Sequence, residues 1–98
     1  MMHMEHLYII SYDVSNQRRW RRLFKMLHGY GEWLQLSVFQ CRLGKMRMLQ
    51  LEASIGEIVN HREDHVLILD LGPAENVNPH VRSIGKSFEP IQRNPVIV

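Results

Sequence analysis

The sequence predicts one α+β domain in which two helices cover one face of an antiparallel sheet. The chain has 98 residues, which is the length of a single domain. Segments rich in β-branched and aromatic residues, typical of strands, alternate with two segments of helical periodicity. The predicted order is strand, helix, strand or strand pair, helix, strand, and this βαββαβ order is that of ferredoxin-like domains.

The first half of the chain supplies a strand, a helix and a second extended segment. Residues 6–13 are apolar and β-branched and predict a strand. Residues 16–29 predict a helix that Ser15 or Asn16 caps, because these side chains accept hydrogen bonds from free backbone N–H groups. Residues 33–43 predict either one long strand or two strands joined by a tight turn.

The helix predicted at residues 16–29 has two different faces. Apolar residues at spacings of three and four form a stripe that we expect to be buried, consisting of Trp20, Leu23, Phe24 and Leu27. Basic residues at helical spacing lie on the opposite face, and these are Arg18, Arg21, Arg22 and Lys25.

The second half of the chain predicts a helix, a buried strand and an extended tail. Residues 45–60 predict a helix, and its expected apolar positions are Met48, Leu49, Ala53, Ile55, Ile58 and Val59. Residues 65–71 are almost wholly apolar, as in a central strand covered on both faces, and Gly-Pro follows them. Residues 81–87 predict a short strand. Residues 88–98 predict a tail strand that docks on the chain's own sheet or on a partner's sheet.

Composition favours a dimer. Apolar residues make up 45% of the chain, a surplus for a domain that buries roughly 60–65% of its unfolded surface. The sheet face that the helices leave open is also apolar. We therefore expect two copies to pack sheet to sheet.

The single cysteine and the terminal residues indicate where the chain functions. Cys41 excludes an internal disulfide and is expected to be a buried small apolar residue. The sequence shows no secretory signal and no apolar run near the ~18–20 residues of a membrane span, so we expect a cytoplasmic protein without membrane contact. Residues 1–5 contain three possible start methionines and are expected to be a disordered or alternative-start segment.

Asp13 is the strongest candidate for chemistry. It closes the first strand, and between Val14 and Gly31 there is no other acid, so it is the only carboxylate near the basic helix in sequence. Mg²⁺, or alternatively Mn²⁺, prefers oxygen ligands and is often held by one or two carboxylates and substrate phosphates. The alternative is that Asp13 caps the helix or pairs with Arg18.

Six basic residues are predicted to contact nucleic acid. Five of them lie between residues 18 and 25 of the predicted helix. No acid lies between them that could neutralise them through i,i+4 ion pairs. These cations are suited to phosphates and do not select a base sequence. The six candidates are Arg18, Arg19, Arg21, Arg22, Lys25 and Arg42, and the alternative is a solvated surface without a ligand.

Several of these residues carry a resemblance to a known family. Tyr12-Asp13-Val14 ends the first strand, Tyr30-Gly31 ends the helix, and Gln35-Leu36-Ser37-Val38-Phe39 follows. Asp64-His65-Val66 then opens a strand, and Pro95-Val96-Ile97-Val98 ends the chain. The sequence thereby resembles the small CRISPR-associated adaptation protein, the second core member of that system (the Cas-two family). It departs from the family at Trp33 and Gln40, where arginine and glutamate are frequent.

The resemblance implies a fold, an assembly and two activities. It implies a ferredoxin-like homodimer and a metal-dependent phosphodiester hydrolysis of RNA or double-stranded DNA, with Asp13 as catalytic and metal-binding residue. It also implies a bridge between integrase subunits during spacer acquisition. Tyr12, Ser37 and Phe39 are the residues that the resemblance places around the cleft, although Phe39 also fits a core position.

Two other functions fit the same fold. One is a toxin-like RNase that also depends on Asp13. The other is a ferredoxin-like regulatory module that binds a small ligand between subunits and hydrolyses nothing. Five clustered cations argue against the small-ligand module, because salt-sensitive nucleic-acid binding is what such a cluster supplies.

Overall fold

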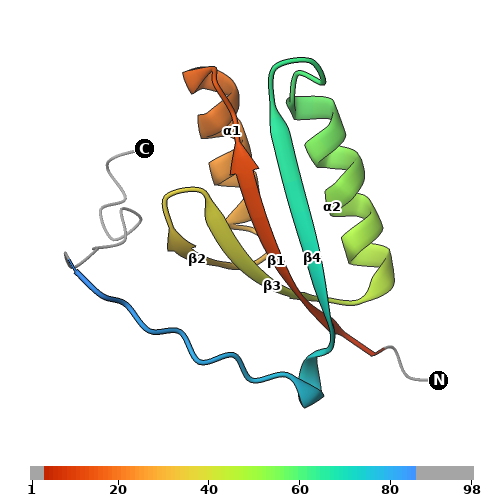
Figure 1. Cartoon of the computed structure of the whole chain (residues 1–98). Coiled ribbons are helices and arrows are strands. Elements are labelled where there is room, and N and C mark those ends of the chain that lie inside the picture. Colours follow the sequence, from red (N-terminus) through yellow and green to blue (C-terminus); the bar gives the residue numbers. More distant parts are fainter. Residues whose placement is uncertain (1–3, 86–98) are drawn as a thin grey trace.

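The computed structural model describes residues 4–85. Within this range the chain forms a sheet, two long helices and one short helix (Figure 1). The elements are β1 (His6–Asp13), α1 (Gln17–Leu27), β2 (Glu32–Gln35), β3 (Val38–Leu43), α2 (Lys45–Ile58), β4 (His65–Pro73) and the 3-10 helix η1 (Ala74–Asn76).

The four strands form one antiparallel sheet in the order β2-β3-β1-β4. Buried residues of α1 and α2 share one cluster with every second residue of β1 and β3, so both helices cover the same face of the sheet. Figure 1 shows this arrangement, with the opposite face free of helices. The predicted ferredoxin-like α+β fold is confirmed.

The extended segment at residues 33–43 is two strands and not one. Leu36 and Ser37 form the turn between β2 and β3. Leu36 has a φ of 25°, a left-handed conformation that is unusual for a branched residue. The indole N–H of Trp33 donates to the Leu36 carbonyl at 3.0 Å, and the backbone N–H of Tyr12 donates to the Ser37 carbonyl at 3.0 Å. The first bond closes the turn within the hairpin, and the second attaches the turn to β1.

The core lies between the sheet and the helices. Its fully buried side chains are Ile10, Leu23, Leu27, Phe39, Cys41 and Leu51, whereas Leu7, which is also fully buried, lies outside this cluster. The prediction for α2 was wrong at two positions, because Leu49 and Ala53 are exposed and the buried residue is Leu51. Met48, Leu51 and Ile55 recur at spacings of three and four, and this stripe is the one that faces the sheet.

Strand β4 differs from its prediction in position and in length. It is an edge strand and not a central one, and Leu67, Leu69 and Leu71 remain 50%, 45% and 39% exposed. The strand also continues through Gly72 to Pro73. Gly72 adopts a φ of 97°, which glycine tolerates, and the ladder with β1 shifts register nearby.

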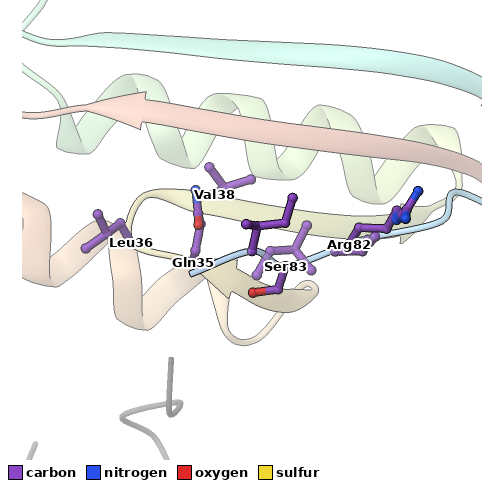
Figure 2. A pocket seen from close by; sticks show the side chains of 8 residues that line it. Gln35, Leu36, Val38, Arg82 and Ser83 are labelled. Carbon is purple, nitrogen blue, oxygen red and sulfur yellow. The ribbon is translucent and has the colours of Figure 1, made fainter. Parts of the chain in front are cut away.

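The two ends of the described chain correct two further expectations. Glu5 is not disordered, because its carbonyl accepts the Ala74 N–H at 2.7 Å. Residues 81–85 form no strand, whereas residues 86–98, including the predicted tail strand, lie outside the described residues. Figure 2 shows Arg82 and Ser83 beside the β2–β3 hairpin, where residues 81–84 line a cavity of about 520 Å³ with Leu34–Leu36 and Val38.

Candidate nucleic-acid interface

Asp13 lies at the carboxyl end of β1 with its side chain exposed. In the ladder it is the partner of His65, the first residue of β4. Within residues 4–85 the Asp13 carboxylate makes no hydrogen bond and no ion pair. The alternative in which Asp13 caps α1 or pairs with Arg18 is therefore wrong for this structure, and its carboxylate oxygens remain available to a ligand.

Helix α1 begins directly after the turn that follows Asp13. Asn16 caps the helix, as predicted, because its side-chain oxygen accepts the Arg19 N–H at 2.9 Å. The exposed basic side chains of this helix are Arg18, Arg21, Arg22 and Lys25, which are hereafter called the basic face. Asn16, Arg18, Arg19 and Arg22 line a shallow cavity of about 510 Å³ at this end of the helix. The basic face is thus open to a polyanion.

Arg19 is engaged differently from the other arginines of α1. Its Nε donates to Asp64 at 2.7 Å, and its Nη2 donates to Asp64 at 3.1 Å and to Glu63 at 3.2 Å. The acids come from the loop between α2 and β4, so the basic helix has acidic neighbours in space that its own sequence lacks. No acid lies between the five cations in sequence, and Arg19 obtains its acidic partners from a distant segment.

Asp64 is the residue of this region that sequence reasoning did not single out. Its side chain is fully buried, and besides Arg19 it accepts the backbone N–H groups of Asn60 at 2.8 Å and Ser15 at 3.2 Å. The hydrogen bonds from Arg19, and then those from the two backbone groups, lower the pKa of Asp64 to about 2 against the opposing effect of burial. The available signal was its place in the Asp64-His65-Val66 motif, which opens the strand beside Asp13.

The β2–β3 turn lies against the same end of β1. The indole N–H of Trp20 donates to the Ser37 hydroxyl at 3.1 Å, and the Ser37 carbonyl accepts the Tyr12 N–H. The structure therefore brings Ser37 next to the Tyr12-Asp13 end of the strand, as the resemblance implied. Its half-buried hydroxyl serves first to orient Trp20.

Phe39 and Tyr12 are core residues in this chain, which confirms the interpretation of Phe39 as a core residue. Phe39 is fully buried, and Tyr12 is 3% exposed and stacks on Phe39 with ring centroids 6.2 Å apart. The Tyr12 hydroxyl is buried and has no hydrogen-bond partner within the described part of the chain. Burial raises the pKa of Tyr12, so this phenol is unsuited to proton transfer near neutral pH.

Arg42 lies away from the other candidates. The ladder pairs it with Leu7, at the opposite end of β1 from Asp13. At about 3.3 Å of rise per residue, these two positions are roughly 20 Å apart along the strand. Arg42 is exposed on the sheet face without helices, so its predicted contact belongs to a surface separate from the basic face.

Asp13 fits a metal ion only as part of a shared site. Among residues 4–85, no group of three or more His, Cys, Asp or Glu side chains is placed to hold a metal ion. Mg²⁺ keeps several waters and takes one or two carboxylates together with substrate phosphate oxygens. An exposed carboxylate that is unpaired within residues 4–85 meets that requirement if substrate or a second copy provides the remaining oxygens.

Cys41 is excluded as a nucleophile. It is 1% exposed, as predicted for a buried apolar residue, and burial raises the pKa of its thiol to about 11. A thiol with this pKa remains protonated at neutral pH, and the thiolate is the reactive form.

The fold and the site define a small ferredoxin-like protein that presents an acidic strand end beside a basic helix. A family model described as CRISPR associated protein Cas2 matches residues 4–78. The chain therefore belongs to the CRISPR-associated Cas2 family. In the described part of the chain, no helix has the length and apolar character needed to cross a membrane.

Two curated relatives extend this match over nearly the whole chain. The CRISPR-associated endoribonuclease Cas2 of Geobacter sulfurreducens is 74% identical over 95 residues, which cover 97% of this chain and 100% of the relative. The CRISPR-associated endoribonuclease Cas2 1 of Rhodospirillum rubrum is 47% identical over 96% of this chain and 92% of its own length.

Solved structures give the same fold. A crystal structure of cas2 has a TM-score of 0.70 and 36% identity, covering 88% of this chain and 95% of that one. The structure of Streptococcus pyogenes Cas2 at pH 6.5 has a TM-score of 0.65 over 76% of this chain and 99% of that chain. At 22% identity this second match supports the fold alone.

Proposed function

We propose that the chain is a spacer-adaptation subunit that binds nucleic acid as a homodimer and hydrolyses phosphodiesters. One observation carries the proposal: within residues 4–85, Asp13 is an exposed carboxylate without an ion pair, and the next helix in the chain has a basic face without acids. Membership of the Cas2 family and relatives named endoribonucleases support the hydrolytic part.

The open face of the sheet supports the homodimer. Leu67, Leu69 and Leu71 form an exposed apolar row on β4, which is an edge strand of the sheet that residues 4–85 form. A second copy packed on this face would remove that surface from water, which favours association. The dimer would also supply a second Asp13 to a shared site.

Each group in the proposed site has a separate role. The basic face holds successive phosphates through charge, so binding is independent of base sequence and weakens with salt. Asp13 accepts a proton or a cation next to the scissile phosphate. A Mg²⁺ or Mn²⁺ ion, when bound, supplies a polarised phosphate or an activated water. The turn of Ser37 and the indole of Trp20 hold the end of β1 in place.

A second candidate is a non-catalytic bridge between integrase subunits on DNA. This bridging role is favoured because Asp13 is the single carboxylate that each chain offers to the proposed site. The described residues of one copy do not form a complete metal site. The basic face is sufficient for holding duplex DNA, and this role does not require Asp13.

The test compares Asp13→Asn with wild type on labelled RNA and on double-stranded DNA. Each protein is incubated with Mg²⁺, Mn²⁺ or EDTA, and Glu57→Gln, which alters an exposed carboxylate on α2, is the matched control. We expect cleavage by wild type and Glu57→Gln only, and none in EDTA. The two substrates identify which nucleic acid is cut.

Two other outcomes are informative. Equal cleavage by wild type and Asp13→Asn would reject Asp13 as the catalytic residue. Salt-sensitive binding without cleavage by either protein would reject hydrolysis, and co-purification with the integrase would then establish the bridge.

A further inference from the structure

We propose that Asp64 is a positioning residue for the Asp13 turn, and that Arg19 is its structural partner and not a phosphate ligand. The positioning role rests on the proposed hydrolysis at Asp13. The assignment of Arg19 does not, because it concerns binding alone. Neither residue's role follows from the basic pattern of α1, in which Arg19 resembles its neighbours.

Asp64 connects three segments that are distant in sequence. It accepts the Asn60 N–H at the start of its own loop, the Ser15 N–H between β1 and α1, and two guanidinium N–H groups of Arg19 in the first turn of α1. Both carboxylate oxygens are used, and the side chain is fully buried. We call this arrangement the Asp64 clamp.

The clamp flanks Asp13 on two sides. The next residue after Asp64 is His65, which is the ladder partner of Asp13. On the other side, Ser15 follows Asp13 by two residues, and its N–H is fixed by Asp64. The backbone carrying Asp13 is thus held both by the ladder and by the clamp, while its carboxylate stays free.

The clamp also divides the arginines of α1 into two kinds. Arg19 is 21% exposed in its side chain and directs two of its donors at a buried carboxylate. Arg18 and Arg22 are exposed and have no ion pair within residues 4–85. A phosphate that engaged Arg19 through these donors would leave Asp64 as an unpaired buried charge, which is unfavourable. Arg22 carries no such penalty.

An amide cannot replace the carboxylate of Asp64. Asparagine has one accepting oxygen and one NH₂ group, and the latter would face backbone or guanidinium donors. The NH₂ group would replace either the oxygen that accepts from Ser15 and Arg19 or the oxygen that accepts from Asn60 and Arg19. Asp64→Asn therefore weakens the hold on Arg19 and releases one of the two backbone N–H groups with little change in volume. Arg19→Gln breaks the same clamp from the other side, and Arg19→Lys keeps the charge and is expected to rescue part of the function.

The first measurement is the salt dependence of binding to a fixed DNA duplex and a fixed RNA. Each phosphate contact contributes about 0.9 to the slope of log affinity against log salt on duplex DNA. We expect Arg22→Gln, the matched control, to lower this slope by roughly one contact, and Arg19→Gln to leave it unchanged. An equal loss of slope in both variants would overturn the assignment of Arg19.

The second measurement separates positioning from binding. In Asp64→Asn and Arg19→Gln we expect kcat to fall roughly 10- to 100-fold with KM nearly constant, because a misplaced catalytic group costs rate and not affinity. Arg22→Gln should instead raise KM. Hydrogen exchange at the Ser15 amide or at the Asn60 amide should become faster in the two clamp variants only.

Folding and the proposed hydrolysis are controlled separately. Circular dichroism shows whether each variant is folded at the assay temperature, and Arg19→Lys replaces any variant that is not. Unchanged kcat and unchanged exchange at both the Ser15 and the Asn60 amide in Asp64→Asn would overturn the clamp. If wild type cleaves nothing, the hydrolytic proposal fails, whereas the salt slopes and amide exchange still confirm or reject the roles of Arg19 and Asp64.

Discussion

The two faces of the sheet differ in how far one chain completes them. On the face covered by α1 and α2, Phe39, Leu23 and Leu51 are fully buried. On the other face, Leu67 and Leu69 on β4 are about half exposed, at 50% and 45%. One copy therefore builds one complete core and leaves a second apolar surface open. The helix-covered face therefore determines the fold of the single chain, and the open face is where we expect a second copy to bind.

The largest expected effect is at the centre of the covered face. Leu51→Ala removes a fully buried side chain of α2 and should lower the free energy of unfolding by about 2–5 kcal/mol. Leu49→Ala, two residues away on the exposed side, should change it by less than about 0.5 kcal/mol. Urea denaturation measures both. Similar losses in the two variants would contradict the orientation of α2.

A second test concerns the close contact between Gly31 and strand β3. A Cβ at Gly31 would overlap the Gln40 carbonyl and the Cys41 sulfur, so Gly31→Ala should destabilise by about 1–3 kcal/mol. Gly56→Ala is the control, because a Cβ in that part of α2 meets nothing within 4 Å. That variant should gain about 0.5–1 kcal/mol from helix propensity. Thermal unfolding of both proteins checks the opposite signs.

The next prediction tests whether the open face of the sheet is a dimer interface. Replacing Leu67 and Leu69 by glutamine should leave the helix-side core intact, and unfolding should shift by little for the isolated chain. We expect the same change to convert a dimeric wild type into a monomer, as measured by light scattering on a sizing column. Leu49→Gln on α2 is the matched control. Dissociation by the control variant alone would place the interface on the helices.

The smallest expected effect is on how the free energy of unfolding depends on pH. This dependence also distinguishes His28 from Asp64. Burial lowers the pKa of His28, because it disfavours the charged imidazole. The contribution of His28 to the free energy of unfolding is therefore complete above about pH 6.5 and is lost as pH falls below that value. Asp64 has a pKa lowered from 3.8 to about 2, so its contribution is lost only as pH falls from 3.8 toward 2. Denaturation at pH 7.5, 5 and 3 should show two separate declines. His28→Phe should remove the first decline and retain the second.

Much of the fold follows from the sequence, because local patterns specify it. The Trp20, Leu23, Phe24 and Leu27 stripe places α1 against the sheet, and Asn16 fixes where that helix begins. The alternation of Phe39, Cys41 and Leu43 gives β3 its buried face. For α2 the same reasoning fails at Leu49, because a helix rich in apolar residues offers more than one stripe and the sheet selects only one.

The candidate site is less predictable, because its decisive contacts join distant segments. Asp13 and the basic face adjoin in sequence, and their exposure follows from a strand end and a helix surface. The role of Arg19 depends on a partner 45 residues away. Phe39 and Tyr12 belong to motifs that suggest function, and their burial depends on how α1 covers β1 and β3.

The sequence by itself determined the order of elements, the helix cap, the buried cysteine and an acid followed by clustered cations, since each depends on neighbours within a few residues. Only the tertiary structure decided that Asp64 holds Arg19, that Leu51 and not Leu49 is buried, and that β4 is an edge strand with an exposed leucine row. The physical reason is that side-chain periodicity limits which faces are apolar, whereas the pairing of strands and loops decides which charges and faces meet.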